Sequence, residues 1–269
     1  MLFLPGSALQ CTAAAAALVV QDTVISSGGQ SLDLSDPKAL EQRADLFMVR
    51  KYYPEAVGLY QKLIVLQPKN ALYQNKLGIA YHQLQNLDAA KRAYRRALQL
   101  NPQYAEAWNN VAAVEYSQKN YRTAILTYIK ALALSPGDAV VYSNLGTAYF
   151  AYEQFEYAIA SYRYALLRDP AIFERTGRTG SIVQQRDIKD PAAFNFYMAK
   201  TYASLGIAER TLEYLRKAWE EGYSDIRKGL QDKAFAFLAQ DPGFLELTAL
   251  IEADFEQKAK SPETAPASR

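Results

Sequence analysis

The stretch "AYRRALQLNP", Ala93 to Pro102, decides the fold because close versions of it occur three more times. Upstream lies "LYQKLIVLQP" (Leu59 to Pro68), and downstream lie "TYIKALALSP" (Thr127 to Pro136) and "SYRYALLRDP" (Ser161 to Pro170). The copies are always 34 residues apart, and a tyrosine, a small residue and a proline stay in step. A fixed period of this length predicts a repeat architecture, in which each unit buries its apolar face against the next.

Each period predicts two helices. In the copy that ends at Pro170, the first helical segment is "YSNLGTAYFAY" (142–152) and the second is "YAIASYRYALL" (157–167). In the second segment, Ala158, Tyr162 and Ala165 fall on one face of a helix with about 3.6 residues per turn. Small residues recur where two helix backbones would approach closely: Gly78, Ala112 and Gly146 in first helices, and Ala90, Ala124 and Ala158 in second helices.

Proline and asparagine mark the expected helix ends. Pro102 and its equivalents lack a backbone N–H and restrict the preceding residue, so they are predicted to end each second helix. Asn86 and Asn120 stand where an N-cap would help a second helix to begin. One such hairpin cannot bury its apolar face, so at least about three copies must stack.

The order of these residues resembles the tetratricopeptide repeat, with W-x2-L-G-x2-Y, then A-x3-F, then P. The most similar copy is 139–172, which matches the pattern at Tyr142, Leu145-Gly146, Tyr149, Ala158, Tyr162, Ala165 and Pro170. The resemblance implies an all-α solenoid, a superhelix of helix-turn-helix units with a C-terminal helical cap. The units expected are residues 37–70, 71–104, 105–138, 139–172 and 192–223.

Some copies depart from the pattern. Glu115 replaces the first tyrosine of the third copy, and Arg43 stands at an apolar place in the first copy, which faces water on one side. The fifth copy is shifted by an insert at 173–191, which we interpret as a surface excursion. The alternative is that the arginines of this insert cover one mouth of a binding groove; they are Arg175, Arg178 and Arg186.

The two ends of the chain lie outside the repeats. Residues 1–36 form an apolar leader and a polar linker. The small residues Ala15 to Ala17 would suit cleavage of a signal peptide. However, no Lys or Arg precedes the apolar run, so the alternative is a disordered leader that is not a signal. We favour export to the periplasm over a cytoplasmic location, and we expect membrane association only through this leader. We assign no function to Cys11, which lies within the leader. Residues 224–256 predict a helical cap, and 257–269 predict a disordered tail. The cap residues expected to cover the last repeat are Ala234, Phe235, Phe237, Leu238, Phe244, Leu245, Leu247 and Leu250.

The composition excludes several classes of function. The chain has one cysteine and one histidine, which argues against zinc sites and against Cys-His or Ser-His-Asp catalysis. The net charge of +2 argues against nucleic acid as a partner. Only a short segment follows the repeats, too little for a catalytic domain. We therefore expect no enzyme activity and no cofactor, and we expect a protein or peptide as the partner.

The resemblance also implies a binding surface, because first helices line the concave face of such solenoids. Aromatic rings and side-chain amides on that face would suit an extended peptide, although Tyr116 and Phe150 could instead be core residues. "KRAYRR" (91–96) on a second helix is read as a solvated outer face, or else as a contact with an anionic membrane or an acidic partner. The candidate groove residues are Met48, Asn75, Ile79, His82, Asn109, Asn110, Tyr116, Asn144, Thr147, Phe150 and Lys200.

These features predict a non-catalytic scaffold that binds a protein or peptide. One alternative is an envelope-associated accessory factor, resembling repeat lipoproteins of secretion or pilus-type machines. Another is the regulatory arm of an enzyme complex. An adaptor for chaperone tails is disfavoured, because Asn75, Glu106 and Val140 stand where that type of groove carries lysine and arginine.

Overall fold

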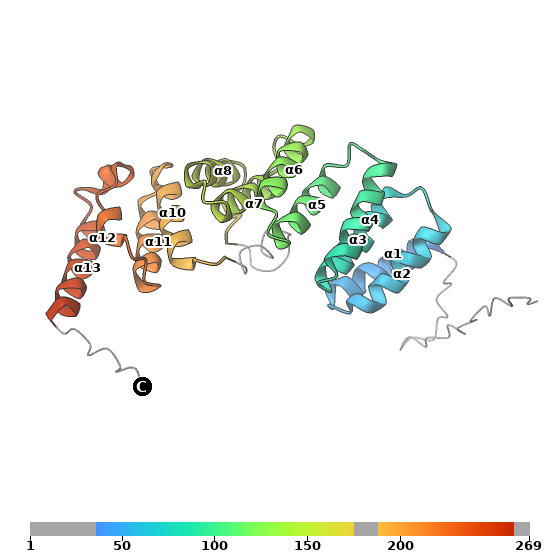
Figure 1. The fold of residues 1–269 in the computed structure, drawn as a ribbon, viewed down its shortest axis with the longest axis horizontal. Coiled ribbons are helices and arrows are strands. Elements are labelled where there is room, and N and C mark those ends of the chain that lie inside the picture. Colours follow the sequence, from blue (N-terminus) through green and yellow to red (C-terminus); the bar gives the residue numbers. More distant parts are fainter. Residues whose placement is uncertain (1–35, 175–187, 261–269) are drawn as a thin grey trace, which may run out of the picture.

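The computed structural model describes residues 36–174 and 188–260, and within these ranges all regular structure is helical (Figure 1). The helices are α1 (Pro37–Val49), α2 (Tyr53–Leu66), α3 (Ala71–Gln83), α4 (Leu87–Leu100), α5 (Ala105–Ser117), α6 (Tyr121–Leu134), α7 (Ala139–Ala151), α8 (Phe155–Arg168), α10 (Pro191–Ala203), α11 (Ala208–Glu220), α12 (Ile226–Gly229), the 3-10 helix η1 (Lys233–Leu238) and α13 (Pro242–Lys260).

The helices are arranged as a row of pairs. The two helices of each pair pack on each other, and each second helix also packs on the first helix of the next pair. Figure 1 shows this row running from α1 and α2 at one end to α13 at the other. The fold is therefore an all-α helix-turn-helix solenoid.

A buried tyrosine occupies the same place in four pairs. Tyr60, Tyr94, Tyr128 and Tyr162 are each at most 1% exposed. A Cβ atom added to Gly78 would lie 2.5 Å from the ring of Tyr94, and one added to Gly146 would lie 2.5 Å from the ring of Tyr162. These two glycines are thus required for the close approach of ring and helix backbone.

Helix ends follow the predicted signals with one exception. The helices α2, α4, α6 and α8 each end two residues before a proline. Asn86 caps α4, because its Oδ1 accepts from the backbone N–H of Ala89 at 3.2 Å. Asn120 makes no such bond to α6, so that predicted cap is wrong. Its amide instead donates to Glu115 Oε2 at 3.1 Å, the residue that departs from the repeat pattern.

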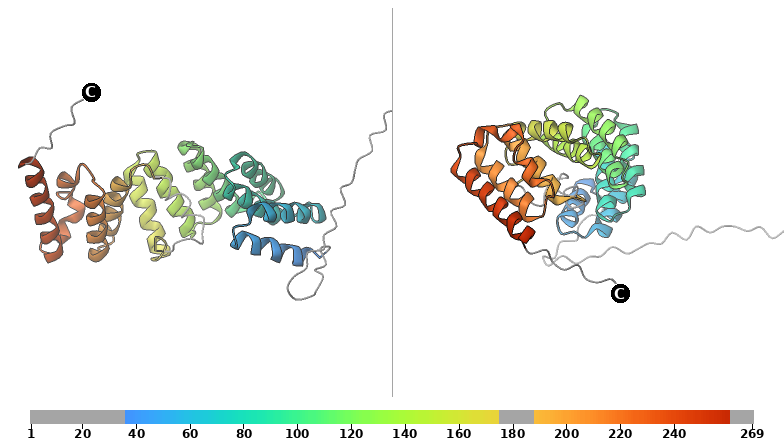
Figure 2. Two further views of the ribbon diagram at one scale, coloured as in Figure 1. Left: turned by 90° about the horizontal axis from the view of Figure 1, so that it is seen from below. Right: turned by 60° about the vertical axis from the view of Figure 1, so that its left-hand side comes forward.

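The row is curved, with the first helices on the inside. Consecutive first helices touch one another, α3 with α5 and α5 with α7, whereas consecutive second helices are not in comparable contact within the described ranges. Elements that are closer together lie on the concave side of a bent row. Figure 2 shows the pairs turning around the long axis of the molecule. The face formed by α3, α5 and α7 is called the inner face below.

The insert does not interrupt the stack, since α10 packs directly on α8. The residues that flank the insert join the same core: Ile172 is buried, and Phe173 and Ile188 pack against the cluster around Tyr162. The three arginines predicted to cover the groove (Arg175, Arg178 and Arg186) lie outside the described residues, so their role stays a prediction.

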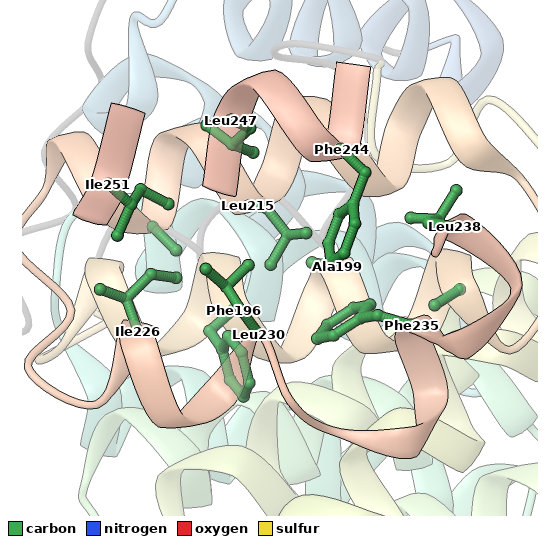
Figure 3. Packing of buried hydrophobic residues seen from close by; sticks show 12 residues of the cluster. Phe196, Ala199, Leu215, Ile226, Leu230, Phe235, Leu238, Phe244, Leu247 and Ile251 are labelled. Carbon is green, nitrogen blue, oxygen red and sulfur yellow. The ribbon is translucent and has the colours of Figure 1, made fainter. Parts of the chain in front are cut away.

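The C-terminal segment covers the last pair, as Figure 3 shows. Phe235, Leu238, Phe244 and Leu247 are buried against Leu215 and its neighbours on α10 and α11. The expected set was only partly correct, because consecutive residues of a helix point in different directions. Three expected members are exposed (Phe237, Leu245 and Leu250), whereas three others close the cluster (Ile226, Leu230 and Ile251).

In the ranges that the structure describes, no helix has the length and apolar character needed to cross a membrane. The leader at 1–35, with Cys11 and the expected cleavage site, lies outside those ranges. The export signal therefore stays a prediction.

Candidate functional site

A chain of side-chain amides crosses the inner face. Asn144 Nδ2 donates to Asn109 Oδ1 at 3.0 Å, and Asn109 Nδ2 donates to Asn110 Oδ1 at 3.4 Å. Asn110 Nδ2 donates to Asn75 Oδ1 at 3.0 Å, and Asn75 Nδ2 donates to Glu106 Oε1 at 3.1 Å. The two bonds of this amide ladder between asparagines of different helices each run from the later helix to the earlier one, and the ladder ends on the carboxylate of Glu106 on α5.

The ladder changes the predicted role of these residues. Asn75, Asn109 and Asn144 are buried, and only Asn110 is half-buried. Their amides are used mainly to join α3, α5 and α7, because buried polar groups must find hydrogen-bond partners. One buried atom among the described side chains lacks a partner, Asn144 Oδ1 at the C-terminal end of the ladder.

Tyr116 and Phe150 are core residues. They are 5% and 8% exposed, and each belongs to a hydrophobic cluster. The Tyr116 ring lies 5.4 Å from the ring of Tyr121, and the Phe150 ring lies 5.6 Å from Phe155 and 5.7 Å from Phe194. The expectation that these two rings face a ligand does not fit this packing, because the following helices cover them.

Thr147 and Lys200 are also engaged within the protein. Thr147 Oγ1 donates to the Ser143 carbonyl at 3.1 Å and accepts from the Tyr162 hydroxyl at 3.2 Å. Lys200 Nζ lies 3.0 Å from Asp232 and 3.4 Å from Glu156, so it ties α10 to the cap and to α8. Neither side chain is free to make a strong contact with a partner without losing these bonds.

The accessible candidates lie in the first three pairs. Met48 on α1, Ile79 and His82 on α3, and Asn110 on α5 are half-buried, so part of each side chain remains in contact with solvent. The candidate site is thereby reduced to the N-terminal half of the predicted groove.

An ionic cluster that the sequence analysis missed lies beside these residues. Lys76 Nζ is 2.7 Å from both Glu41 Oε1 and Asp45 Oδ2, and its side chain is half-buried. Burial alone would lower the pKa of Lys76, but its hydrogen bonds to Asp45 and Glu41 outweigh burial and raise the pKa. Glu41 and Asp45 are four residues apart and so lie on one side of α1, and Lys76 follows about one period later. This spacing is the sequence signal that could have predicted the ionic cluster.

His82 has a lowered pKa, because the partial burial of its ring disfavours the charged imidazolium. The neutral ring can both donate and accept a hydrogen bond at neutral pH. Among the described residues, no group of three His, Cys, Asp or Glu side chains is placed to hold a metal ion.

The lowered pKa of His82 predicts a pH-dependent stability. The unfolded chain binds a proton below about pH 6.5, whereas the folded chain resists protonation. The free energy of unfolding should therefore be constant above about pH 7 and fall as the pH decreases through 6.5, by at most about 1.4 kcal/mol per pH unit. Urea unfolding between about pH 7.5 and 5.5 measures this.

The matched variant is His82→Gln, which cannot titrate. Because the chain has a single histidine, this variant should lose the decrease in that pH window. An equal decrease in both proteins would contradict the assignment to His82.

A family model of the tetratricopeptide repeat matches residues 41–90 and 75–139, which run from α1 to the start of α7. The helical pairs, the 34-residue period and the small-residue contacts described above agree with this match. The protein contains tetratricopeptide repeats. In such a protein the inner face described above is the surface formed by the first helices of the repeats.

Solved structures with a similar fold were also found. MamA (residues 41 to the end) from Desulfovibrio magneticus RS-1 is 20% identical, with a TM-score of 0.50 and coverage of 71% of this tetratricopeptide repeat protein and 97% of MamA. YrrB, described as a tetratricopeptide repeat protein with an unusual peptide-binding site, is 17% identical, with a TM-score of 0.46 and coverage of 71% and 89%. At these identities the likeness to MamA concerns the fold alone. The search of curated proteins gave no match.

Proposed function

We propose that this protein is a non-catalytic scaffold that binds a protein segment or extended peptide on its inner face and holds it for assembly. The observation that carries the proposal is the amide ladder. It fixes α3, α5 and α7 relative to one another before any partner arrives, and a preformed surface binds at a smaller entropic cost than a mobile one.

The accessible side chains supply the contacts in this proposal. Met48 and Ile79 offer apolar surface, and neutral His82 and Asn110 offer hydrogen bonds to a peptide backbone. The Lys76 cluster holds α1 against α3 and so maintains the spacing of the first two pairs.

The test begins with a displayed library of random peptides and the full chain. A selected peptide is then labelled, and its affinity is measured by fluorescence polarisation for the parent and for Met48→Glu with Ile79→Glu. We expect the variant to bind at least about tenfold more weakly, because two carboxylates would be desolvated by the peptide. Helical circular dichroism checks that the variant is folded.

The matched control places the same two charges on the opposite side of the solenoid. Gln99→Glu with Thr123→Glu alters exposed residues of second helices, so its affinity for the peptide should equal that of the parent. If the groove variant binds as tightly as this control, the inner face is not the binding site.

A further inference from the structure

The second helices present an outer face with an unusual charge. The helices α4, α6 and α8 turn their buried residues inward, among them Tyr94, Tyr128 and Tyr162, so the residues on the other side of each helix point outward. These three helices carry eight lysines and arginines against two acidic residues, although the whole chain has a net charge of only +2. Most of this positive charge thus lies on the outer side of these three pairs; Lys91 is an exception, because it is paired with Glu115.

Three arginines of this face are not neutralised by the protein. Arg92, Arg95 and Arg96 on α4 are exposed, and no carboxylate of the described residues forms an ion pair with them. Arg96 has one hydrogen bond, from Nη1 to the neutral Gln99 side chain at 3.0 Å. Their charges are therefore available to an anionic partner.

The last second helix, α11, shows that this is not a general property of the repeats. There the charges are paired along the helix: Glu213 lies 2.7 Å from Arg210 and 2.6 Å from Lys217. Such i,i+3 and i,i+4 pairs neutralise a solvated helix surface. The unpaired arginines of α4 are a distinct feature of the earlier repeats.

Bulky apolar side chains are exposed beside these charges. Leu126 and Ile129 on α6 and Tyr157, Tyr164 and Leu167 on α8 are large, and Leu126 and Leu167 are 62% and 61% exposed. Leu126 is one period after Arg92, and Tyr164 is two periods after Arg96, so these residues occupy equivalent outward positions of the stacked pairs. The outer face of α4, α6 and α8 is therefore both basic and apolar.

We propose that this outer face binds the surface of an anionic lipid bilayer. Exposed arginines and lysines attract anionic headgroups, and leucine, isoleucine and tyrosine side chains insert at the boundary between headgroups and acyl chains. The face is convex, so it can rest on a flat layer of headgroups, whereas a bound helix or extended peptide requires a groove. Binding in this way leaves the inner face free, and it does not depend on the leader.

The test is cosedimentation of the full chain with vesicles. One set contains phosphatidylcholine alone, and the other contains about 30% phosphatidylglycerol. We expect binding to the anionic vesicles only, and weaker binding at about 0.5 M salt than at 0.1 M, because salt screens exposed charges. No binding to the anionic vesicles, or equal binding to both sets, would overturn the proposal.

Charge variants locate the surface. Arg92→Glu with Arg96→Glu should reduce the partition coefficient by about 30-fold or more, since each basic residue near the bilayer contributes about a factor of five. The control is Arg216→Glu with Lys228→Glu, which makes the same change of charge at exposed residues outside this face and should lower the coefficient much less. If the two variants lose binding equally, net charge explains it and the face is not the site.

Apolar variants separate a membrane from other anionic partners. Leu126→Ser with Leu167→Ser should weaken vesicle binding at least about fivefold, whereas Leu245→Ser with Leu250→Ser on α13 should not. Binding that survives the arginine and leucine changes would belong to the leader and would overturn the proposal. So would capture of an acidic protein by the outer face in the absence of any affinity for vesicles.

Discussion

Replacing Lys91 with alanine is expected to lower the free energy of unfolding by about 3 kcal/mol or more. Lys91 Nζ on α4 lies 2.7 Å from Glu115 Oε1 on α5, and the Glu115 side chain is only 7% exposed. Without the ammonium, the buried carboxylate would keep only the amide of Asn120 as a partner. Removing one member of a buried pair costs far more than the pair itself contributes.

The same chain provides the matched control. One period later, Ile125 and Tyr149 hold the places of Lys91 and Glu115, and both are apolar contacts of one cluster. The double change Lys91→Ile with Glu115→Tyr should therefore leave stability within about 1 kcal/mol of the parent, or raise it. Urea unfolding followed by far-ultraviolet circular dichroism measures both variants. A double variant as unstable as Lys91→Ala would show that the ion pair is not replaceable by repeat-like packing.

Ala124→Arg is expected to destabilise the protein by more than about 3 kcal/mol. Ala124 is fully buried on α6, in the cluster that also contains Ala112 on α5 and Val141 on α7. A guanidinium there would add volume to a contact between helices and would bring a charge without a partner. Thermal and urea unfolding should both show the loss, with a large decrease in midpoint.

The control for this variant lies on the same helix. Leu126→Arg introduces arginine at an exposed position of α6, so the unfolding midpoint of this variant should stay near that of the parent. If the Ala124→Arg variant had the same unfolding midpoint as the Leu126→Arg control, this result would contradict the packing described for the third pair.

The repeats could be predicted because their signals are local. Pro68 and Pro102 end helices through their own covalent geometry, and Gly78 and Gly146 occur where a ring meets a helix backbone. These signals return every 34 residues, so each copy supports the interpretation of the others. The prediction that Asn120 caps α6 was wrong, because the Asn120 side chain donates to Glu115, the residue that departs from the repeat pattern.

The candidate site was harder to predict. Tyr116 and Phe150 were expected at the inner face from their place in the repeat, and the fold covers them with later helices. The buried asparagines hydrogen-bond to one another across helices, so their availability depends on how closely α3, α5 and α7 approach. Residues such as Met48 and His82 remain candidates because the first pairs leave them partly uncovered.

By itself, the sequence determined the class of this protein: a helix-turn-helix solenoid of the tetratricopeptide type, with the period and the ends of its second helices. Those features arise within a helix or between adjacent helices, where spacing along the chain dictates spacing in space. Only the tertiary structure decided which inner side chains are buried, how the amide ladder runs, and which arginines remain unpaired. These properties depend on the curvature of the row and on contacts between residues about one period apart, which no local pattern specifies.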